Sequence, residues 1–214
     1  MTYSVREIYF TLQGEGAQTG RPAVFLRFSG CNLWSGREAH RATAVCRFCD
    51  TEFVGTNGPG GGKFETAAAL ADAVLEAWPT AAGSARPFVV CTGGEPLLQL
   101  DAAAIDALHA SGFEIGVETN GTLAAPPGID WLCVSPKGAA PLVQTEGDEL
   151  KLVYPQDEPE AQPGVFDGMR FAVFSLQPLD NDARAINTEK AVRFCLAHPQ
   201  WRLSLQTHKL RGID

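Results

Sequence analysis

Short apolar runs that alternate with amphipathic helical segments restrict the fold of this chain more than any other feature. Apolar, β-branched runs predict eight strands, over residues 5–10, 23–28, 88–91, 114–117, 131–134, 150–153, 170–174 and 202–205. Three amphipathic segments predict helices over residues 66–78, 102–111 and 188–198. Strands that alternate with helices are typical of α/β domains with a mainly parallel sheet.

The length of the chain limits which α/β fold it can form. The 214 residues suffice for one domain with a sizeable core, so residues 1–214 are predicted to form a single unit. A closed eightfold βα barrel typically needs about 250 residues. We therefore predict an incomplete, split βα barrel with few helices, in which loops at the carboxyl ends of the strands carry the chemistry.

The helix boundaries predict specific caps and inward positions. In the first helix Leu70 and Leu75 are assigned to the inward face. In the second, Asp101 is expected to be the N-cap. In the third, Thr188 is expected to be the cap, with Leu196 facing inward.

The net charge and the hydropathy of the chain argue against several functional classes. With 17 basic and 25 acidic residues, the net charge of −8 disfavours bulk binding to nucleic acid or to a membrane surface. No run of 18 apolar residues predicts a membrane span, and the first ten residues lack the pattern of a signal peptide. A cytoplasmic location is therefore expected, where six cysteines are thiols or metal ligands rather than disulfides.

Cys31, Cys46 and Cys49 form a group with no fourth cysteine nearby. Four thiolates complete the protein shell of a [4Fe–4S] cluster, so three leave one iron open to a substrate or cofactor. One alternative is a structural zinc site that includes His40. Another is a thioredoxin-type pair, which should open a helix, whereas residues 50–54 predict extended chain.

The remaining cysteines, Cys91, Cys133 and Cys195, lie within strand or helix patterns. They are expected to be small buried hydrophobic residues.

A glycine-rich turn, Thr92-Gly93-Gly94-Glu95-Pro96, directly follows the strand predicted over 88–91. Glycines let the backbone approach a ligand closely, and Glu95 can either anchor the turn or meet a charged amino group. Alone, this sequence is an ordinary strand-to-helix turn. Together with the three-cysteine loop it predicts radical chemistry with S-adenosylmethionine.

A second glycine-rich segment, residues 58–63, only superficially suggests a phosphate-binding loop. Asn57 stands where that motif requires glycine, and Phe64 where it requires serine or threonine. A flexible surface turn is expected instead.

Several motifs resemble the 7-carboxy-7-deazaguanine synthase family of the radical S-adenosylmethionine superfamily. They are Leu12-Gln13-Gly14-Glu15-Gly16, the segment from Arg27 to Leu33, and Cys49-Asp50-Thr51. Further matches at residues 118–121, 134–137, 149–151 and 175–178 extend the resemblance over nearly the whole chain. The superfamily usually spaces its cysteines Cys-x3-Cys-x2-Cys, whereas fourteen residues separate Cys31 from Cys46 here, so residues 32–45 are predicted to be an insertion.

The resemblance implies an activity. The family converts 6-carboxy-5,6,7,8-tetrahydropterin to 7-carboxy-7-deazaguanine by radical ring contraction with loss of ammonia, a lyase reaction that feeds queuosine and other deazapurines. It implies a [4Fe–4S] cluster, S-adenosylmethionine and Mg²⁺, an electron donor such as flavodoxin, and a homodimer.

The resemblance also implies residue roles. Cys31, Cys46 and Cys49 would bind the cluster. Residues expected to contact S-adenosylmethionine are Phe48, Cys49, Asp50, Gly94, Ser135, Pro136, Lys137, Ser175, Leu176, Gln177 and Pro178. Residues expected to contact the pterin are Leu12, Gln13, Gly14, Arg27, Thr92, His208 and Asp214, and Thr51 would bind Mg²⁺. Arg27 is singled out because it interrupts an apolar run and a guanidinium pairs bidentately with a carboxylate.

Three alternatives remain open at this point. An activase that makes a glycyl radical on a partner protein would share the cluster and the glycine turn, but Gln13, Glu15, Arg27 and Thr51 argue against it. A zinc-stabilised binding module would be colourless and would not catalyse a reaction. An iron–sulfur electron carrier would need no open iron.

Overall fold

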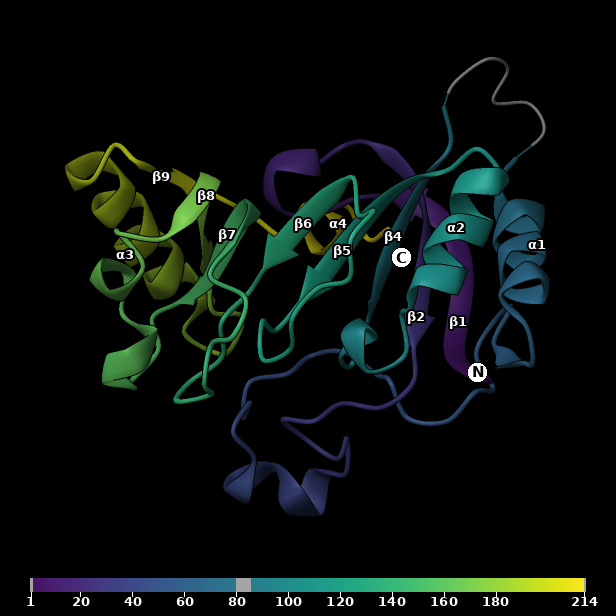
Figure 1. Ribbon diagram of the computed structural model, residues 1–214. Helices are drawn as coiled ribbons and strands as arrows, with labels where there is room; N and C mark the ends of the chain where they lie inside the picture. The colour runs from purple at the N-terminus through teal and green to yellow at the C-terminus, as the bar shows by residue number, and fades with distance from the viewer. Residues whose placement is uncertain (1, 80–85, 214) are drawn as a thin grey trace.

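The computed structural model describes residues 2–79 and 86–213 and shows a mixed α/β arrangement around one sheet (Figure 1). In these residues the sheet has nine strands in the order β3-β1-β2-β4-β5-β6-β7-β8-β9. The strands are β1 (Tyr3–Leu12), β2 (Pro22–Phe28), β3 (Gly62–Phe64), β4 (Phe88–Gly93), β5 (Glu114–Thr119), β6 (Trp131–Val134), β7 (Glu146–Tyr154), β8 (Arg170–Pro178) and β9 (Trp201–Leu203). All eight predicted strands are present, and the short β3 was missed.

Strand direction confirms a mainly parallel sheet. β1 pairs antiparallel with both β2 and β3. Every other neighbouring pair, from β2–β4 to β8–β9, is parallel. The carboxyl ends of β2 and of β4 to β9 therefore meet at one edge, where the loops that follow them converge.

The helices are α1 (Ala67–Ala77), α2 (Ala102–Ala110), α3 (Arg184–Ala197) and the short α4 (Thr207–Arg211). Figure 1 shows α1 and α2 together beside β1, β2 and β4, and α3 at the opposite end beside β8 and β9. The N-cap role of Asp101 is confirmed, because its side chain accepts from the Ala104 amide. The sequence did not predict α4.

Three helix assignments were wrong. Leu75 is exposed, since only Leu70, Ala71 and Val74 of α1 are buried. Helix α3 begins at Arg184, one turn before Thr188, whose hydroxyl donates to the Arg184 carbonyl inside the helix. Leu196 is exposed because α3 buries Asn187 and Ala191 instead.

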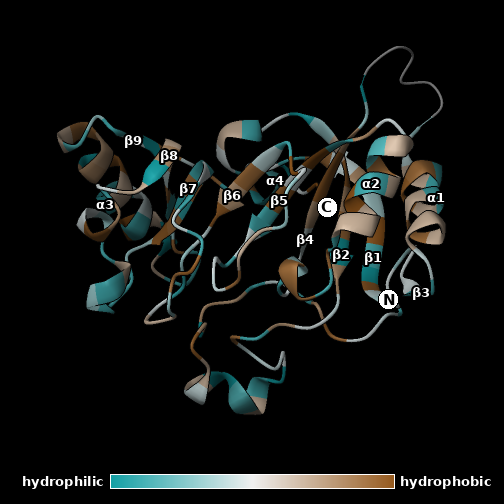
Figure 2. Cartoon of the chain, viewed as in Figure 1, coloured by the Kyte–Doolittle hydropathy of each residue, from teal (hydrophilic) through white to brown (hydrophobic). Residues whose placement is uncertain are grey.

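The two faces of the sheet differ in character. Leu26 of β2 and Leu150 and Leu152 of β7 belong to the main hydrophobic core, which also contains residues of α1 and α2. Their neighbours Arg27 and Lys151 point the other way, into a cavity. Successive strand residues face opposite sides of a sheet, so a single charged residue in an apolar run is placed on the cavity side. The hydropathy colouring shows brown, apolar strands at the centre of the molecule (Figure 2).

The glycine-rich segment 58–62 contains a turn with Pro59 and Gly60 at the surface, as predicted, but it is tied to β1 by its backbone. The Gly58 amide donates to the Arg6 carbonyl, and the Pro59 carbonyl accepts from the Ile8 amide. A Cβ added at Gly61 would lie 2.2 Å from the Arg6 oxygen, so this segment packs directly against β1.

Candidate functional site

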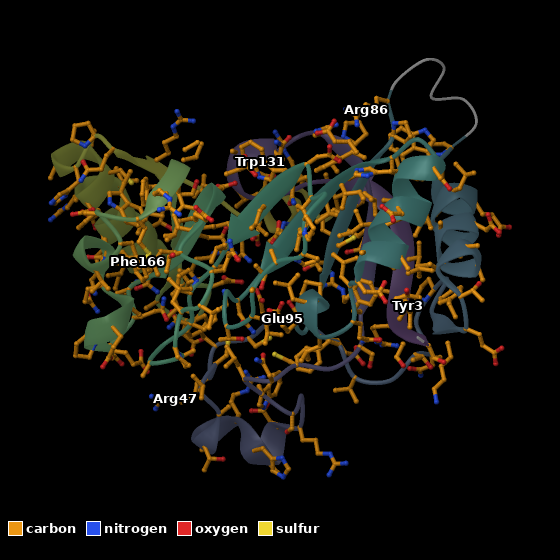
Figure 3. All side chains as sticks on the ribbon, viewed as in Figure 1. Tyr3, Arg47, Arg86, Glu95, Trp131 and Phe166 are labelled. Atoms are coloured by element: carbon orange, nitrogen blue, oxygen red, sulfur yellow. The ribbon has the colours of Figure 1, made fainter. Side chains whose placement is uncertain are left out.

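A cavity of about 470 Å³ lies at the carboxyl ends of the parallel strands. Its volume is in the usual range for a small-molecule site. Most of the predicted site residues line it: Leu12, Gln13, Gly14, Arg27, Cys31, Cys46, Phe48, Cys49, Asp50, Thr51, Thr92, Gly94, Ser135, Lys137, Gln177, Pro178 and His208. In Figure 3, Glu95 lies toward this end of the sheet and Arg47 on the loop beyond it, whereas Trp131, at the start of β6, lies at the opposite end.

All three clustered cysteines are free thiols that face the cavity. A hydrogen bond between Cys46 and Cys49 lowers the pKa of Cys49 to about 6 and raises the pKa of Cys46, which burial raises further. Burial also raises the pKa of Cys31. The two thiols of the pair therefore differ in acidity, and Cys49 is the more acidic one.

The glycine turn is needed for contact between two loops. A Cβ at Gly94 would lie 2.1 Å from the Gly30 carbonyl oxygen and 2.7 Å from Cβ of Cys31. Gly93 has φ +149°, and a Cβ there would lie 2.3 Å from the Phe28 oxygen. The turn after β4 therefore packs against the start of the cysteine loop, the segment that carries Cys31, Cys46 and Cys49. A side chain at Gly93 or Gly94 would prevent this packing.

Of the two roles considered for Glu95, the structure shows the anchor. Glu95 is fully buried, and its carboxylate accepts from the Thr119 hydroxyl and the Asn120 amide at 2.7 Å each, and from the Leu97 amide at 3.0 Å. Burial raises the pKa of this carboxyl although all three donors oppose the shift. Its oxygens tie the β4 turn to the end of β5.

Arg27 is held on the cavity side of β2 by two partners on β1. Its Nε donates to Glu7 at 2.7 Å and one terminal nitrogen donates to the Tyr9 hydroxyl at 3.0 Å. Burial lowers the pKa of Arg27, but Tyr9 and Glu7 outweigh it and raise the value overall. Arg27 is thus a charged, oriented guanidinium in the cavity wall.

A buried charge cluster that the sequence did not assign lies farther along the sheet. Lys151 donates to Glu15 at 2.7 Å and to Glu118 at 3.0 Å, and its side chain is only 4% exposed. Burial alone would raise the pKa of Glu15, but the Lys151 ammonium and hydrogen bonds from Gln206 and Gln177 lower it to about 2. Burial would lower the pKa of Lys151, yet Glu118 and Glu15 hold it well above its usual value. A lone lysine in the apolar run of residues 150–153 was the signal that could have identified it.

Gln13 is less available than predicted. Its amide nitrogen donates to Glu118 at 2.8 Å, and its amide oxygen accepts from the Glu15 amide at 3.0 Å. One donor and one acceptor of the Gln13 amide are thus engaged inside the protein, and Gln13 orients Glu118 in the cavity wall.

Residues 206–213 form part of the cavity wall directly beside Gly14. A Cβ at Gly14 would lie 2.2 Å from Nδ1 of His208, and the Thr207 amide donates to the Gly14 carbonyl at 2.9 Å. Lys209 pairs with both Asp50 and Asp180, so α4 is tied to the cysteine loop and to the end of β8. The predicted site residue Asp214 lies outside the described residues.

Some predicted contacts fall elsewhere. Pro136, Ser175 and Leu176 do not line the cavity. The Ser175 hydroxyl donates to the buried Glu149, and Leu176 belongs to the hydrophobic core. Lys137 does line the cavity, where its ammonium donates to the carbonyl and hydroxyl oxygens of Ser135.

Nothing in the described residues favours the zinc alternative. No group of three or more His, Cys, Asp or Glu side chains in residues 2–79 and 86–213 is placed to hold a metal ion. His40 is exposed and its Nδ1 pairs with the Ser35 hydroxyl at 2.8 Å. Cys31, Cys46 and Cys49 instead share one cavity, which His40 does not line.

Comparison with known proteins supports the resemblance over the full length. No family model matches the chain. The 7-carboxy-7-deazaguanine synthase of Caulobacter vibrioides is 63% identical over 213 residues, and that of Burkholderia multivorans 59%, each with all of both chains covered. A crystal structure of QueE from Escherichia coli has a TM-score of 0.71 and 29% identity, and the match covers 97% of this chain and 95% of that one. With such identity over the full length of both chains, the chain belongs to the 7-carboxy-7-deazaguanine synthase family.

Proposed function

We propose that this protein is a radical S-adenosylmethionine lyase that converts 6-carboxy-5,6,7,8-tetrahydropterin to 7-carboxy-7-deazaguanine. One observation carries the proposal: three free thiols and an oriented guanidinium, Arg27, line the same cavity. The thiols suit a [4Fe–4S] cluster with one open iron, and the guanidinium suits the carboxylate of the substrate. When bound, the cluster, reduced by one electron from an external donor, and S-adenosylmethionine would supply the radical chemistry of the ring contraction.

The residues of the chain bind the cofactors and the substrate, orient them and exclude water from the cavity. Cys31, Cys46 and Cys49 hold the cluster, and Phe48 and Asp50 lie beside it on the S-adenosylmethionine side. Gly94 leaves its backbone accessible to the methionyl amine, and Lys137 faces the cavity near the methionyl carboxylate or a ribose hydroxyl.

On the substrate side, Arg27 pairs with the carboxylate while Leu12, Gly14, Thr92 and His208 enclose the ring. Glu118, set by Gln13 and Lys151, offers a carboxylate to the ring nitrogens. Thr51 would offer one oxygen to Mg²⁺, an ion that usually binds few protein groups and keeps several waters.

Other features follow from the family and are part of the proposal. We expect one domain shaped as a split βα barrel, a homodimer, a cytoplasmic location and an electron donor such as flavodoxin. The structure itself shows only that, in residues 2–79 and 86–213, no helix has the length and apolar character to cross a membrane.

The deciding experiment is anaerobic. The protein is reconstituted with iron and sulfide, reduced, and mixed with S-adenosylmethionine, Mg²⁺ and 6-carboxytetrahydropterin, and the products are followed by mass. Formation of 7-carboxy-7-deazaguanine supports the proposal. Cleavage of S-adenosylmethionine with the pterin untouched would favour an activase, and a colourless zinc protein would exclude radical chemistry.

A further inference from the structure

The insertion, residues 32–45, has an apolar centre of its own. Trp34 is 8% exposed and packs edge-on against Phe53, with ring centroids 5.7 Å apart at 83°. Phe53 follows the cysteines, and its carbonyl accepts from the Gly30 amide just before them. The insertion therefore packs against the segment where the cysteine loop ends, although its short helical turn at residues 38–43 is polar (Figure 2).

Arg41 connects this apolar centre to the cysteines. Its guanidinium carbon lies 4.1 Å from the centroid of the Trp34 ring, a cation–π arrangement. Its Nε donates to both carboxylate oxygens of Glu38 at 2.8 Å. Three of its contacts thus come from the insertion itself and fix the plane of the guanidinium.

The remaining contacts of Arg41 reach the cysteine turn, residues 46–49. Its Nη1 donates to the Arg47 carbonyl at 3.0 Å and to the Cys49 carbonyl at 2.9 Å. These two carbonyls flank Phe48, so one nitrogen fixes the backbone on both sides of that residue. Cys46, Phe48 and Cys49 all face the cavity from this turn.

We propose that Arg41 is a positioning residue that holds the cysteine turn in the geometry of cluster binding and places a positive charge behind it. This inference rests on the proposed function for the identity of the cluster. Charge and hydrogen bonding around a cluster set its reduction potential, and a nearby cation favours the reduced, more negative form. A short loop between the cysteines would restrain the cysteine turn by its length alone. In this chain the loop is longer, and Arg41 supplies the restraint instead.

The test compares Arg41→Ala with Arg37→Ala, which removes an exposed guanidinium from the same insertion. Hydrogen exchange of the cluster-free protein measures order in residues 44–53 without any cofactor. We expect exchange there to be about tenfold faster in Arg41→Ala, since two charge-assisted hydrogen bonds are lost, and unchanged in Arg37→Ala. Arg41→Lys should restore part of the protection, because an ammonium can also donate to both carbonyls.

The same variants are then loaded with iron and sulfide. Arg41→Ala should shift the cluster midpoint potential to more negative values and change the electron paramagnetic resonance spectrum on addition of S-adenosylmethionine, while Arg37→Ala matches the wild type. The proposal would be overturned if Arg41→Ala had the same hydrogen-exchange rates and the same cluster midpoint potential as the wild type. If the wild type binds no cluster, the proposed function fails, whereas the exchange result still decides whether Arg41 orders the turn.

Discussion

The cysteine loop and the polar face of the sheet supply opposite walls of one cavity, but they are built differently. Arg27, Glu118 and Lys151 lie on strands, where strand alternation fixes their direction and neighbouring strands supply their partners. Cys31, Cys46 and Cys49 lie on irregular chain, where side chains such as Arg41 bond to backbone carbonyls.

Because of this difference, the strand residues should contribute to both folding and binding, whereas the loop residues should contribute mainly to function. Groups on the strands are buried among ion pairs, so changing them disturbs folding as well as binding. Groups on the loop carry little of the hydrophobic core, so changing them should remove function while the fold survives.

Cys46→Ala should abolish cluster assembly and turnover, because the remaining thiols cannot complete a three-cysteine site. The free energy of unfolding of the cluster-free protein should fall by only about 1 kcal/mol, because Cys46 is buried but lies outside the main hydrophobic core. Iron content, visible absorbance and urea unfolding check both parts. Cys195→Ala on α3 is the control and should keep the cluster. Loss of the fold in Cys46→Ala would refute this difference between strand and loop residues.

Arg27→Ala should lower kcat/KM for the carboxylated pterin by about a hundredfold, the usual cost of losing one charged partner of a carboxylate. Cluster content should stay near that of the wild type, since Arg27 pairs with Glu7 and Tyr9 rather than with the cysteine loop. Arg21→Ala serves as the control because Arg21 pairs with Glu114 outside the cavity lining. Equal turnover in Arg27→Ala and the wild type would remove Arg27 from the substrate site.

Glu15→Gln should lower the free energy of unfolding at pH 7 by about 2 kcal/mol, because one carboxylate partner of the buried Lys151 is lost. The Glu15 pKa of about 2 lies below its ordinary value of 4.5, so its ionised form stabilises the folded state. The difference between wild type and variant should be complete above about pH 4.5 and shrink as the pH falls toward 2.

Urea unfolding at several pH values measures this difference. Glu52→Gln is the control, since Glu52 is largely exposed and its pair with Arg6 should contribute little. A destabilisation of Glu15→Gln that is the same at pH 3 and pH 7 would show that the charge of Glu15 is not its cause.

Sequence reasoning found the strands and the parts of the site that depend on local pattern. Arg27 stood out because it is a charged residue in an apolar run. Lys151 also lies in an apolar run, but it was not assigned a role. The sequence could not show that Gln13 is engaged by Glu118 and Glu15, because those contacts join segments distant in the chain.

Contacts between segments distant in the chain also decide other parts of the structure. Ser175 and Leu176 follow a correct strand, yet their side chains bond to Glu149 or enter the core, which depends on how β7 and β8 pair. The site role of Glu95 was undecided from sequence because its donors Thr119 and Asn120 come from the next strand. Short α4 carries too little periodicity to be found from its five residues.

The contact of Gly14 with His208 has a consequence for synthesis of the protein on the ribosome. One part of the cavity wall comes from an early segment of the chain and the part beside it from residues 206–213. The sheet can form step by step as its strands emerge, but the cavity stays open until residues 206–213 have left the exit tunnel. A nascent chain that lacks them also lacks the contacts of Gln206 with Glu15 and of Lys209 with Asp50 and Asp180, so this wall is completed only after the segment has been synthesised.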